Sequence, residues 1–388
     1  MSDIQKVHEW LAGGALSGPE SQDVLAQLCE RLVEAGIPLW RAAVFVTTLH
    51  PDVMGRRFLW QAESGVTVSN AFHSLVETDD FRKSPFTTVY ATRKPLRCRF
   101  TDADSAPDFE VLQDLRAQGA TDYVAFPLVF TDSSIHVATW STRQPGGFTD
   151  RQFSALESVI APLARVAEIR AQKRTAENLL DTYLGHQTGE KILAGKIRRG
   201  YVEAIRAAIW LSDMRGFTTL SERLPPQELI DLLNRYFGAQ VPAIIEHGGE
   251  VLKFMGDGLL AIFPIADDGD ADAVCGRALA CARAVETQVA ELPRAAGNEA
   301  TRFRVALHAG EVMYGNIGGG NRLDFTCIGP AVNLAARLEK VAGKLGETIV
   351  ASADFAAHVP GAFARRGEYP VAGFAAPQMV FGLASAAS

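Results

Sequence analysis

The sequence predicts an α+β protein of two domains joined by a long helix. The chain has 388 residues, 47% of them hydrophobic, which is enough for more than one buried core. Residues 149–184 contain no glycine and repeat apolar residues at helical spacing. Before and after them, apolar runs of strand length alternate with amphipathic helical segments. We therefore place a first domain at 1–150, a helix and coupling segment at 151–202, and a second domain at 203–388.

Composition and charge exclude several classes of protein. A net charge of -7 argues against a surface that binds a nucleic-acid polymer. The five cysteines form neither a CxxC pair nor the pattern of a disulfide framework, so we expect them to be reduced and buried. The N-terminus is charged, and no stretch approaches the ~20 apolar residues that a membrane span requires. We therefore expect a cytoplasmic protein with no membrane span.

The first domain is predicted to contain a sheet accompanied by helices. In chain order, the expected elements are a helix at 20–36, strands at 42–49 and 57–61, a helix near 109–118, and strands at 123–130 and 135–141. This order resembles a GAF-type α/β sensor domain, which often holds a small ligand. The resemblance is one of architecture, and no sequence motif adds to it. It implies an unidentified small ligand at the N-terminal domain.

The stretch between the domains predicts either one long helix or a parallel pair of helices. The alternative is a plain terminal helix followed by a linker. Glycines at 185, 189, 195 and 200 break the next segment into short helical turns. The apolar positions at helical spacing are Phe153, Leu156, Ile160, Leu163, Val166 and Ile169.

The second domain is also predicted to be mixed. Its expected elements include a strand at 202–213, a helix at 226–247, a helix after the acidic run 267–272, a strand at 302–309 and a helix that begins near Pro330. The acidic run has the DxDxD spacing of a calcium loop, but Ala273 stands where that loop needs glycine. We interpret its carboxylates as residues of a helix start. Four glycines between 315 and 320 predict a flexible hairpin tip.

Residues 251–263, VLKFMGDGLLAIF, predict two buried strands joined by a two-residue turn. Gly256 occupies the first turn position, which suits the primed geometry of such hairpins. Asp257 then lies at the tip, and Lys253 is a cation in an otherwise apolar strand, which is costly without a partner. In isolation, an ordinary turn aspartate and a snorkelling edge lysine would explain both residues.

Two further stretches carry polar side chains in suggestive places. The strand at 202–213 ends in Asp213 beside the start of a helix, where free backbone amides suit a metal-bound phosphate. An N-cap aspartate is the alternative interpretation. On the helix after Pro330, Asn333 and Arg337 are four residues apart and project from one flank. An amide beside a guanidinium suits a ribose and a phosphate.

The segments SDMRGFTTLSE, KFMGDG and GPAVNLAARLE, in this order and at this separation, resemble the class III nucleotidyl cyclases over about residues 203–384. The resemblance implies a ferredoxin-like catalytic domain that works as a homodimer with active sites shared between its two chains. It also implies an adenylate cyclase that converts ATP to 3',5'-cyclic AMP and pyrophosphate with two Mg²⁺ or Mn²⁺ ions per site.

The resemblance assigns roles to individual residues of this chain. It implies that Asp213 and Asp257 bind the two metal ions and that the Met214 carbonyl completes one metal site. Lys253 and Thr326 match the pair that reads the purine, and this pair resembles a bacterial subgroup that includes bicarbonate-responsive adenylyl cyclases. The resemblance implies that the phosphates are bound by Arg322 and by the backbone amides of Arg215, Gly216, Phe217 and Thr218. It also implies that Asn333 orients the ribose and that Arg337 stabilises the transition state.

The chain departs from the family pattern at one place. Many members carry a phosphate-binding lysine near the C-terminus, whereas this chain reads YPVAGFAAP with Ala372 in that neighbourhood. Arg365 or Arg366 is a candidate replacement. Two alternatives stay open: a guanylate cyclase, which Lys253 disfavours, and a nucleotide-binding cyclase-like module of low activity, which the missing lysine favours.

The chemistry of the matched residues agrees with the resemblance. Two carboxylates on adjacent strands suit a metal pair that lowers the pKa of the ribose 3'-hydroxyl and neutralises the triphosphate. The hydroxyl then attacks the α-phosphorus in line, and Arg337 meets the charge that develops there. No side-chain base is needed.

Overall fold

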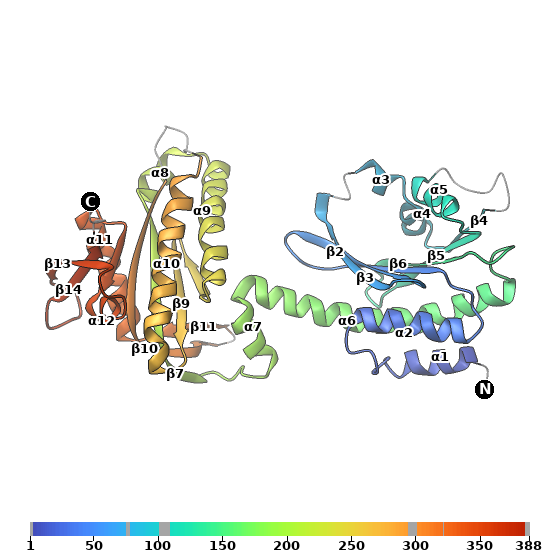
Figure 1. Cartoon of the computed structure of the whole chain (residues 1–388), viewed down its shortest axis with the longest axis horizontal. Helices are drawn as coiled ribbons and strands as arrows, with labels where there is room; N and C mark the ends of the chain where they lie inside the picture. The colour runs from blue at the N-terminus through green and yellow to red at the C-terminus, as the bar shows by residue number, and fades with distance from the viewer. Residues whose placement is uncertain (1–2, 75–77, 101–108, 294–300, 321, 385–388) are drawn as a thin grey trace. The chain divides into compact units, whose positions relative to one another are not determined.

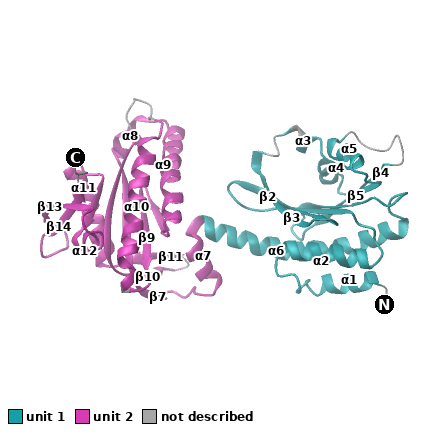
Figure 2. Cartoon of the chain, viewed as in Figure 1, with its two compact units in different colours: residues 1–182 teal, residues 183–388 magenta. Residues whose placement is uncertain are grey.

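A computed structural model describes the chain apart from residues 1–2, 75–77, 101–108, 294–300, 321 and 385–388. The chain divides into two compact units, residues 1–182 and 183–388 (Figure 2), and each unit is described by itself. Among the described residues, no helix has both the length and the apolar character needed to cross a membrane. The mixed α+β class expected from the sequence is confirmed.

Unit 1 contains an antiparallel six-stranded sheet with the strand order β3-β2-β1-β6-β5-β4. Helices lie on both of its faces (Figure 1). Side chains of β5 alternate between two cores: Val124 and Phe126 pack with α1, α2 and α6, whereas Tyr123 and Ala125 pack with α4 and α5. The strands are β1 (Arg41–Thr47), β2 (Val53–Gln61), β3 (Gly65–Phe72), β4 (Leu96–Arg99), β5 (Asp122–Val129) and β6 (Ile135–Thr142). The helices are α1 (Asp3–Ala12), α2 (Ser21–Glu34), α3 (Asp79–Arg82), α4 (Pro85–Thr92), α5 (Glu110–Ala117) and α6 (Asp150–Leu184).

The predicted helices and strands of unit 1 are present, and the structure adds others. The sequence prediction missed β3 and β4 as well as α1, α3 and α4. In β3 only Ala71 is buried, so its sequence shows no apolar alternation. β4 has four residues, which is too short for a periodic pattern. The GAF-like character of this unit stays a prediction.

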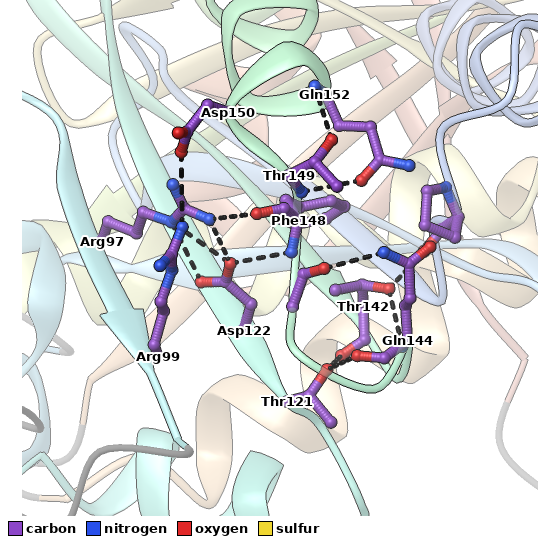
Figure 3. Close-up of polar contacts among 12 residues, drawn as sticks. Arg97, Arg99, Thr121, Asp122, Thr142, Gln144, Phe148, Thr149, Asp150 and Gln152 are labelled. Carbon is purple, nitrogen blue, oxygen red and sulfur yellow. Dashed lines mark hydrogen bonds and ion pairs between the residues drawn. The ribbon is translucent and has the colours of Figure 1, made fainter.

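A buried carboxylate fixes the start of α6 to the sheet (Figure 3). Asp122, at the start of β5, is fully buried and accepts hydrogen bonds from the Arg97 guanidinium at 2.7 Å and from the Phe148 amide at 3.0 Å. Gly147 precedes this amide with a φ of +76°, and a Cβ there would lie 2.7 Å from the Asp122 carboxylate. Only glycine fits this position, because both the conformation and the space exclude a side chain.

The helix α6 is one continuous helix of 35 residues that contains Pro162. It begins with a capping box in which Thr149 and Gln152 each accept the other's backbone amide proton (Figure 3). Its first half packs into unit 1, where the side chains of Leu156, Val159, Leu163 and Val166 are buried. Ile169, which the sequence pattern placed on the apolar stripe, is 65% exposed, whereas the packing of α6 on the core continues through Ala167 and Ala171.

Unit 2 has an eight-stranded sheet with the order β13-β14-β12-β10-β7-β9-β8, and β11 pairs with β10. The segment from β7 to β10 is ferredoxin-like, since its βαββαβ connection and its antiparallel order β10-β7-β9-β8 are those of that fold. The strands are β7 (Val202–Arg215), β8 (Glu250–Met255), β9 (Gly258–Ile265), β10 (Arg302–Gly319), β11 (Arg322–Ile328), β12 (Ile349–Ser352), β13 (Phe363–Tyr369) and β14 (Gln378–Leu383). The helices are α7 (His186–Leu193), α8 (Phe217–Arg223), α9 (Pro226–Glu246), the 3-10 turn η2 (Asp268–Asp270), α10 (Ala271–Ala290), α11 (Pro330–Leu345) and α12 (Ala353–Ala357).

The two faces of this sheet carry different helices. Trp210 of β7 packs in the core that α9 and α10 cover, whereas its neighbours Ile209 and Leu211 pack with Ala331 and Ala335 of α11. This alternation follows from the period of two along a strand. Side chains at the end of β7 therefore lie either in the α9–α10 core or on the α11 side.

Two turns of unit 2 were predicted, and both hairpins are present. The hairpin of β8 and β9 has the expected two-residue turn, with Met255 paired to Gly258 and Gly256 at a φ of +69°. In the second hairpin Gly319 of β10 pairs with Arg322 of β11, but Gly315, Gly318 and Gly319 lie inside β10. A Cβ at Gly315 would lie 2.1 Å from the Tyr201 carbonyl oxygen, and one at Gly318 would lie 2.2 Å from a carbonyl oxygen of β11. These glycines permit close approach of backbones.

Candidate active site

Two carboxylates meet at one end of the ferredoxin-like sheet. Asp213 lies near the end of β7, and Asp257 lies in the turn just before β9, which pairs with β7. Burial and the neighbouring Asp213 carboxyl raise the pKa of Asp257 to about 7, although the Met214 amide, which donates a hydrogen bond to it, acts in the opposite direction. A divalent cation at this position would favour the ionised form of Asp257 beside the neighbouring carboxylate.

The donor set at this position suits a metal ion that arrives with phosphate. Within the described ranges, no group of three or more His, Cys, Asp or Glu side chains could hold a metal ion by itself. Mg²⁺ is commonly bound by one or two carboxylates together with substrate phosphates and water, which matches a pair of aspartates. The Met214 side chain is buried in the α9–α10 core, so Met214 can contribute only its backbone atoms.

A cation that the sequence analysis did not identify bridges this pair to α11. Arg304 of β10 lies opposite Asp213 in the strand register and donates a hydrogen bond to it at 2.8 Å. The Arg304 Nε atom also lies 2.5 Å from Glu339 Oε1, although neither atom makes a well-aligned hydrogen bond. Glu339 is only 8% exposed, and this burial raises the pKa of its carboxyl. Arg304 and Glu339 are charged residues within apolar patterns, which is the signal that could have identified them.

Lys253 and Thr326 lie on β8 and β11, two strands that an ion pair joins. Lys253 of β8 forms an ion pair with Asp324 of β11 at 3.1 Å, and Asp324 and Thr326 project from the same face because they are two residues apart. Thr326 is 4% exposed, and its hydroxyl has no hydrogen-bond partner within the described part of the chain. A buried unpaired hydroxyl costs about 1–3 kcal/mol, so this group is suited to a ligand partner.

The remaining predicted site residues lie on α8, β11 and α11. Asn333 is exposed and Arg337 is partly exposed, and neither side chain makes a hydrogen bond or ion pair with another described residue. The structure records no hydrogen bond or ion pair between these two side chains and the aspartate pair, all four of which lie in its described part. Gly216 takes a φ of +82° as the N-cap of α8, which Phe217 and Thr218 begin, and Arg322 is an exposed residue at the start of β11.

The two arginines considered as replacements for the missing lysine already have carboxylate partners. Arg365 pairs with Glu368 at 3.3 Å. The Arg366 Nε atom lies 2.5 Å from Glu347, and its Nη2 atom donates to the Leu383 carbonyl at 2.8 Å. Both guanidinium groups are therefore engaged in contacts within β13 and with the segments beside it.

Comparisons with known proteins agree with the geometry of unit 2. The model of the adenylate and guanylate cyclase catalytic domain matches residues 203–383. Adenylate cyclase 1 of Rhizobium meliloti is 28% identical over 264 residues, which are 64% of this chain and 38% of that protein. The adenylate cyclase of Anabaena cylindrica is 32% identical over 163 residues, which are 40% of this chain and 31% of that protein. The chain thus spans about a third of the length of these curated relatives.

Solved structures of both cyclase types are also similar to this chain. The adenylyl cyclase CyaB from P. aeruginosa is 26% identical, covering 48% of this chain and 97% of its own with a TM-score of 0.42. The guanylyl cyclase Cya2 is 31% identical, covering 48% and 95% with a TM-score of 0.39. Residues 203–383, with the matching motifs on β7, β8 and α11, therefore match the adenylate and guanylate cyclase catalytic domain, and the expected class III nucleotidyl cyclase domain is confirmed for that part of the chain.

Proposed function

We propose that this protein is an adenylate cyclase, which converts ATP to 3',5'-cyclic AMP and pyrophosphate. The observation that carries the proposal is the proximity of Lys253 to β11, where the buried Thr326 hydroxyl has no hydrogen-bond partner among the described residues. An ammonium donor beside a hydroxyl can pair with both the ring nitrogen and the amino group of adenine. Guanine presents a carbonyl and donors of its own, and it needs an acceptor that lysine does not offer. Two of the curated relatives are named adenylate cyclases, which also supports ATP as the substrate.

In this proposal the residues of unit 2 divide the work of an in-line displacement. Asp213, Asp257 and the Met214 carbonyl would hold two Mg²⁺ or Mn²⁺ ions. When bound there, such ions would lower the pKa of the ribose 3'-hydroxyl and neutralise the charge of the triphosphate. Arg304 holds the Asp213 carboxylate in place through its hydrogen bond and its contact with Glu339.

The nucleotide itself is held by the other predicted residues. Backbone amides at Gly216, Phe217 and Thr218, together with Arg322, would bind the phosphates. Asn333 would orient the ribose so that its 3'-oxygen faces the α-phosphorus opposite the leaving pyrophosphate. Arg337 would stabilise the charge on the transferring phosphate.

We further infer that the working enzyme is a homodimer whose active sites are each built from two chains. In one chain, no hydrogen bond or ion pair joins the aspartate pair to Asn333 or Arg337. The side chains of Asn333 and Arg337 have no such partner among the described residues and are at least partly exposed, which leaves them available to a second chain. A two-fold axis would then create two identical sites.

The experiment that tests the proposed activity is an assay of purified protein with ATP or GTP in the presence of Mg²⁺ or Mn²⁺. We expect cyclic AMP from ATP and little cyclic GMP from GTP. The Asp213→Asn variant, checked for folding by circular dichroism, should form neither product. Preferential formation of cyclic GMP, or a fully active Asp213→Asn variant, would refute the proposal.

A further inference from the structure

Unit 1 contains a cavity of about 300 Å³ between α2, the face of β1, β2 and β3, and α6. This volume is at the lower end of the range of small-molecule sites. One part of its wall is apolar and comes from both the sheet and the helices. The apolar side chains include Leu25, Val44, Val46, Phe58, Leu163 and Val166.

The other part of the cavity wall carries more positive than negative charge. Its cations are Arg56, Arg170, Lys173 and Arg174, and its only carboxylates among the described residues are Glu20 and Glu177. Both carboxylates are near Arg174, at 3.9 Å and 3.5 Å, and Glu177 also lies 3.9 Å from Lys173. Arg170 donates to the backbone carbonyls of Gly18 and Pro19. The negative charge of the wall therefore lies around Arg174.

Arg56 is the cation that this arrangement leaves without a partner. Its guanidinium makes no hydrogen bond or ion pair with any described residue, and it is only partly exposed. Burial, and then the positive charge of nearby Arg174, lowers the pKa of Arg56. A partly buried cation that faces another cation is unfavourable unless an anion joins them.

We propose that this cavity binds a small amphiphilic anion, with its carboxylate or phosphate head between Arg56 and Arg174 and its apolar part against Val44, Val46 and Phe58. Planar guanidinium groups present paired donors that match the oxygens of such a head group. The apolar wall would bury the rest of the ligand. The ligand would then contact α6 along Leu163–Glu177.

The location of the cavity suggests a regulatory role. α6 extends from this wall to Leu184, at the boundary of the two units. Binding that orders Arg174 and Glu177 would also bias the helix on which they lie. This consequence rests on the proposed cyclase activity, whereas binding itself does not.

The test is isothermal titration calorimetry of the full-length protein with sodium octanoate, octyl phosphate and octanol. We expect saturable binding of one octanoate or one octyl phosphate per chain, and much weaker binding of octanol. Arg56→Ala should weaken binding of the anions at least about tenfold, because it removes a charge-assisted hydrogen bond. Arg57→Ala is the matched control, since Arg57 is the next residue on β2, is exposed and bonds Ser69 instead.

A second variant separates binding in the cavity from binding elsewhere. Val46→Phe fills the apolar wall while leaving all four cations in place, and it should also weaken octanoate binding. Circular dichroism and the midpoint of thermal unfolding check that each variant is folded. Three results would each overturn the proposal: no saturable binding of either anion, equal binding of octanol, or equal affinities of Arg56→Ala and wild type. Because the readout is heat of binding, an inactive cyclase domain would not affect it.

Discussion

Lys253 and Thr326 decide the choice of purine in this account. Replacing them by Glu and Cys removes the cationic donor and supplies an acceptor for the guanine donors. We expect kcat/KM for ATP to fall by at least about tenfold, since a buried polar group then lacks its partner. The ratio of GTP turnover to ATP turnover should rise. Steady-state kinetics with both nucleotides measure the change.

The control for this specificity change is Asp324→Asn, which weakens the ion pair of Lys253 but leaves both proposed base-reading groups in place. It should keep the preference for ATP. If the double variant shows the same ATP kinetics as wild type, the base is read by other residues.

Arg304 is the cation that lies between the carboxylates of Asp213 and Glu339. Arg304→Gln removes the cation between two carboxylates and leaves Glu339 buried without a partner. Removing one partner of a buried ion pair costs about 3 kcal/mol or more, so we expect a loss of about that size in the free energy of unfolding. Urea denaturation measures it.

Arg302→Gln is the matched control for Arg304→Gln, because Arg302 is exposed and lies two residues away on the same strand. It should change the stability by less than about 0.5 kcal/mol. If the two variants are equally stable, the contacts of Arg304 with Asp213 and Glu339 do not contribute to the free energy of unfolding.

From the sequence, candidate site residues could be predicted where a residue type with suitable chemistry interrupts a regular local pattern. Lys253 and Asp257 stand out within one apolar hairpin, whose turn Gly256 marks. Arg304 and Glu339 were missed because their importance comes from strand register and from packing across a long stretch of sequence. The local pattern shows that each is a charged residue among apolar ones, but it does not show which residues they meet in the fold.

At the scale of helices and strands, the start of α6 is anchored to the sheet of unit 1 by a buried carboxylate. Asp122→Ala removes the carboxylate that holds the Arg97 guanidinium and the Phe148 amide. Loss of this fully buried group should lower the free energy of unfolding of unit 1 by about 3–5 kcal/mol. The measurement is chemical denaturation followed by tryptophan fluorescence.

Asp150→Ala provides the comparison for the α6 anchor. Asp150 is the first residue of α6, and its ion pair with Arg99 at 3.5 Å is exposed. Exposed pairs contribute about 0–1 kcal/mol, so this variant should be close to wild type. If Asp122→Ala is equally stable, the anchor does not hold the helix.

Helices and strands were predicted well where their burial produces a regular spacing of apolar residues, and poorly where it does not. α6 follows from its apolar spacing and its lack of glycine, and the β8–β9 hairpin from its apolar flanks and its turn. β3 was missed because its exposed face leaves no alternation. The glycines of β10 were misinterpreted because close backbone approach and flexibility produce the same residue type.

For the whole molecule, α6 also determines where unit 1 can be removed. A deletion of residues 1–148 would expose the apolar stripe from Leu156 to Val166, whereas a deletion of residues 1–182 removes unit 1 together with the helix that packs on it. We expect the second deletion to change the cyclase rate, because it removes the proposed sensor. If the protein lacking residues 1–182 and the full-length protein have equal rates under every condition, including with octanoate and bicarbonate, coupling between the units is contradicted.

The central claim is that the aspartate pair of one chain and the α11 residues of another act together on one ATP. Asp257→Asn and Arg337→Ala homodimers should each be nearly inactive, since every site in them carries a lesion. A mixed dimer would place both lesions in one site and leave the other intact. With random and complete subunit exchange, about half of the dimers are mixed and each has one good site of two, so mixing should restore about a quarter of wild-type cyclic AMP production. No recovery from folded variants that demonstrably exchange subunits would contradict the account.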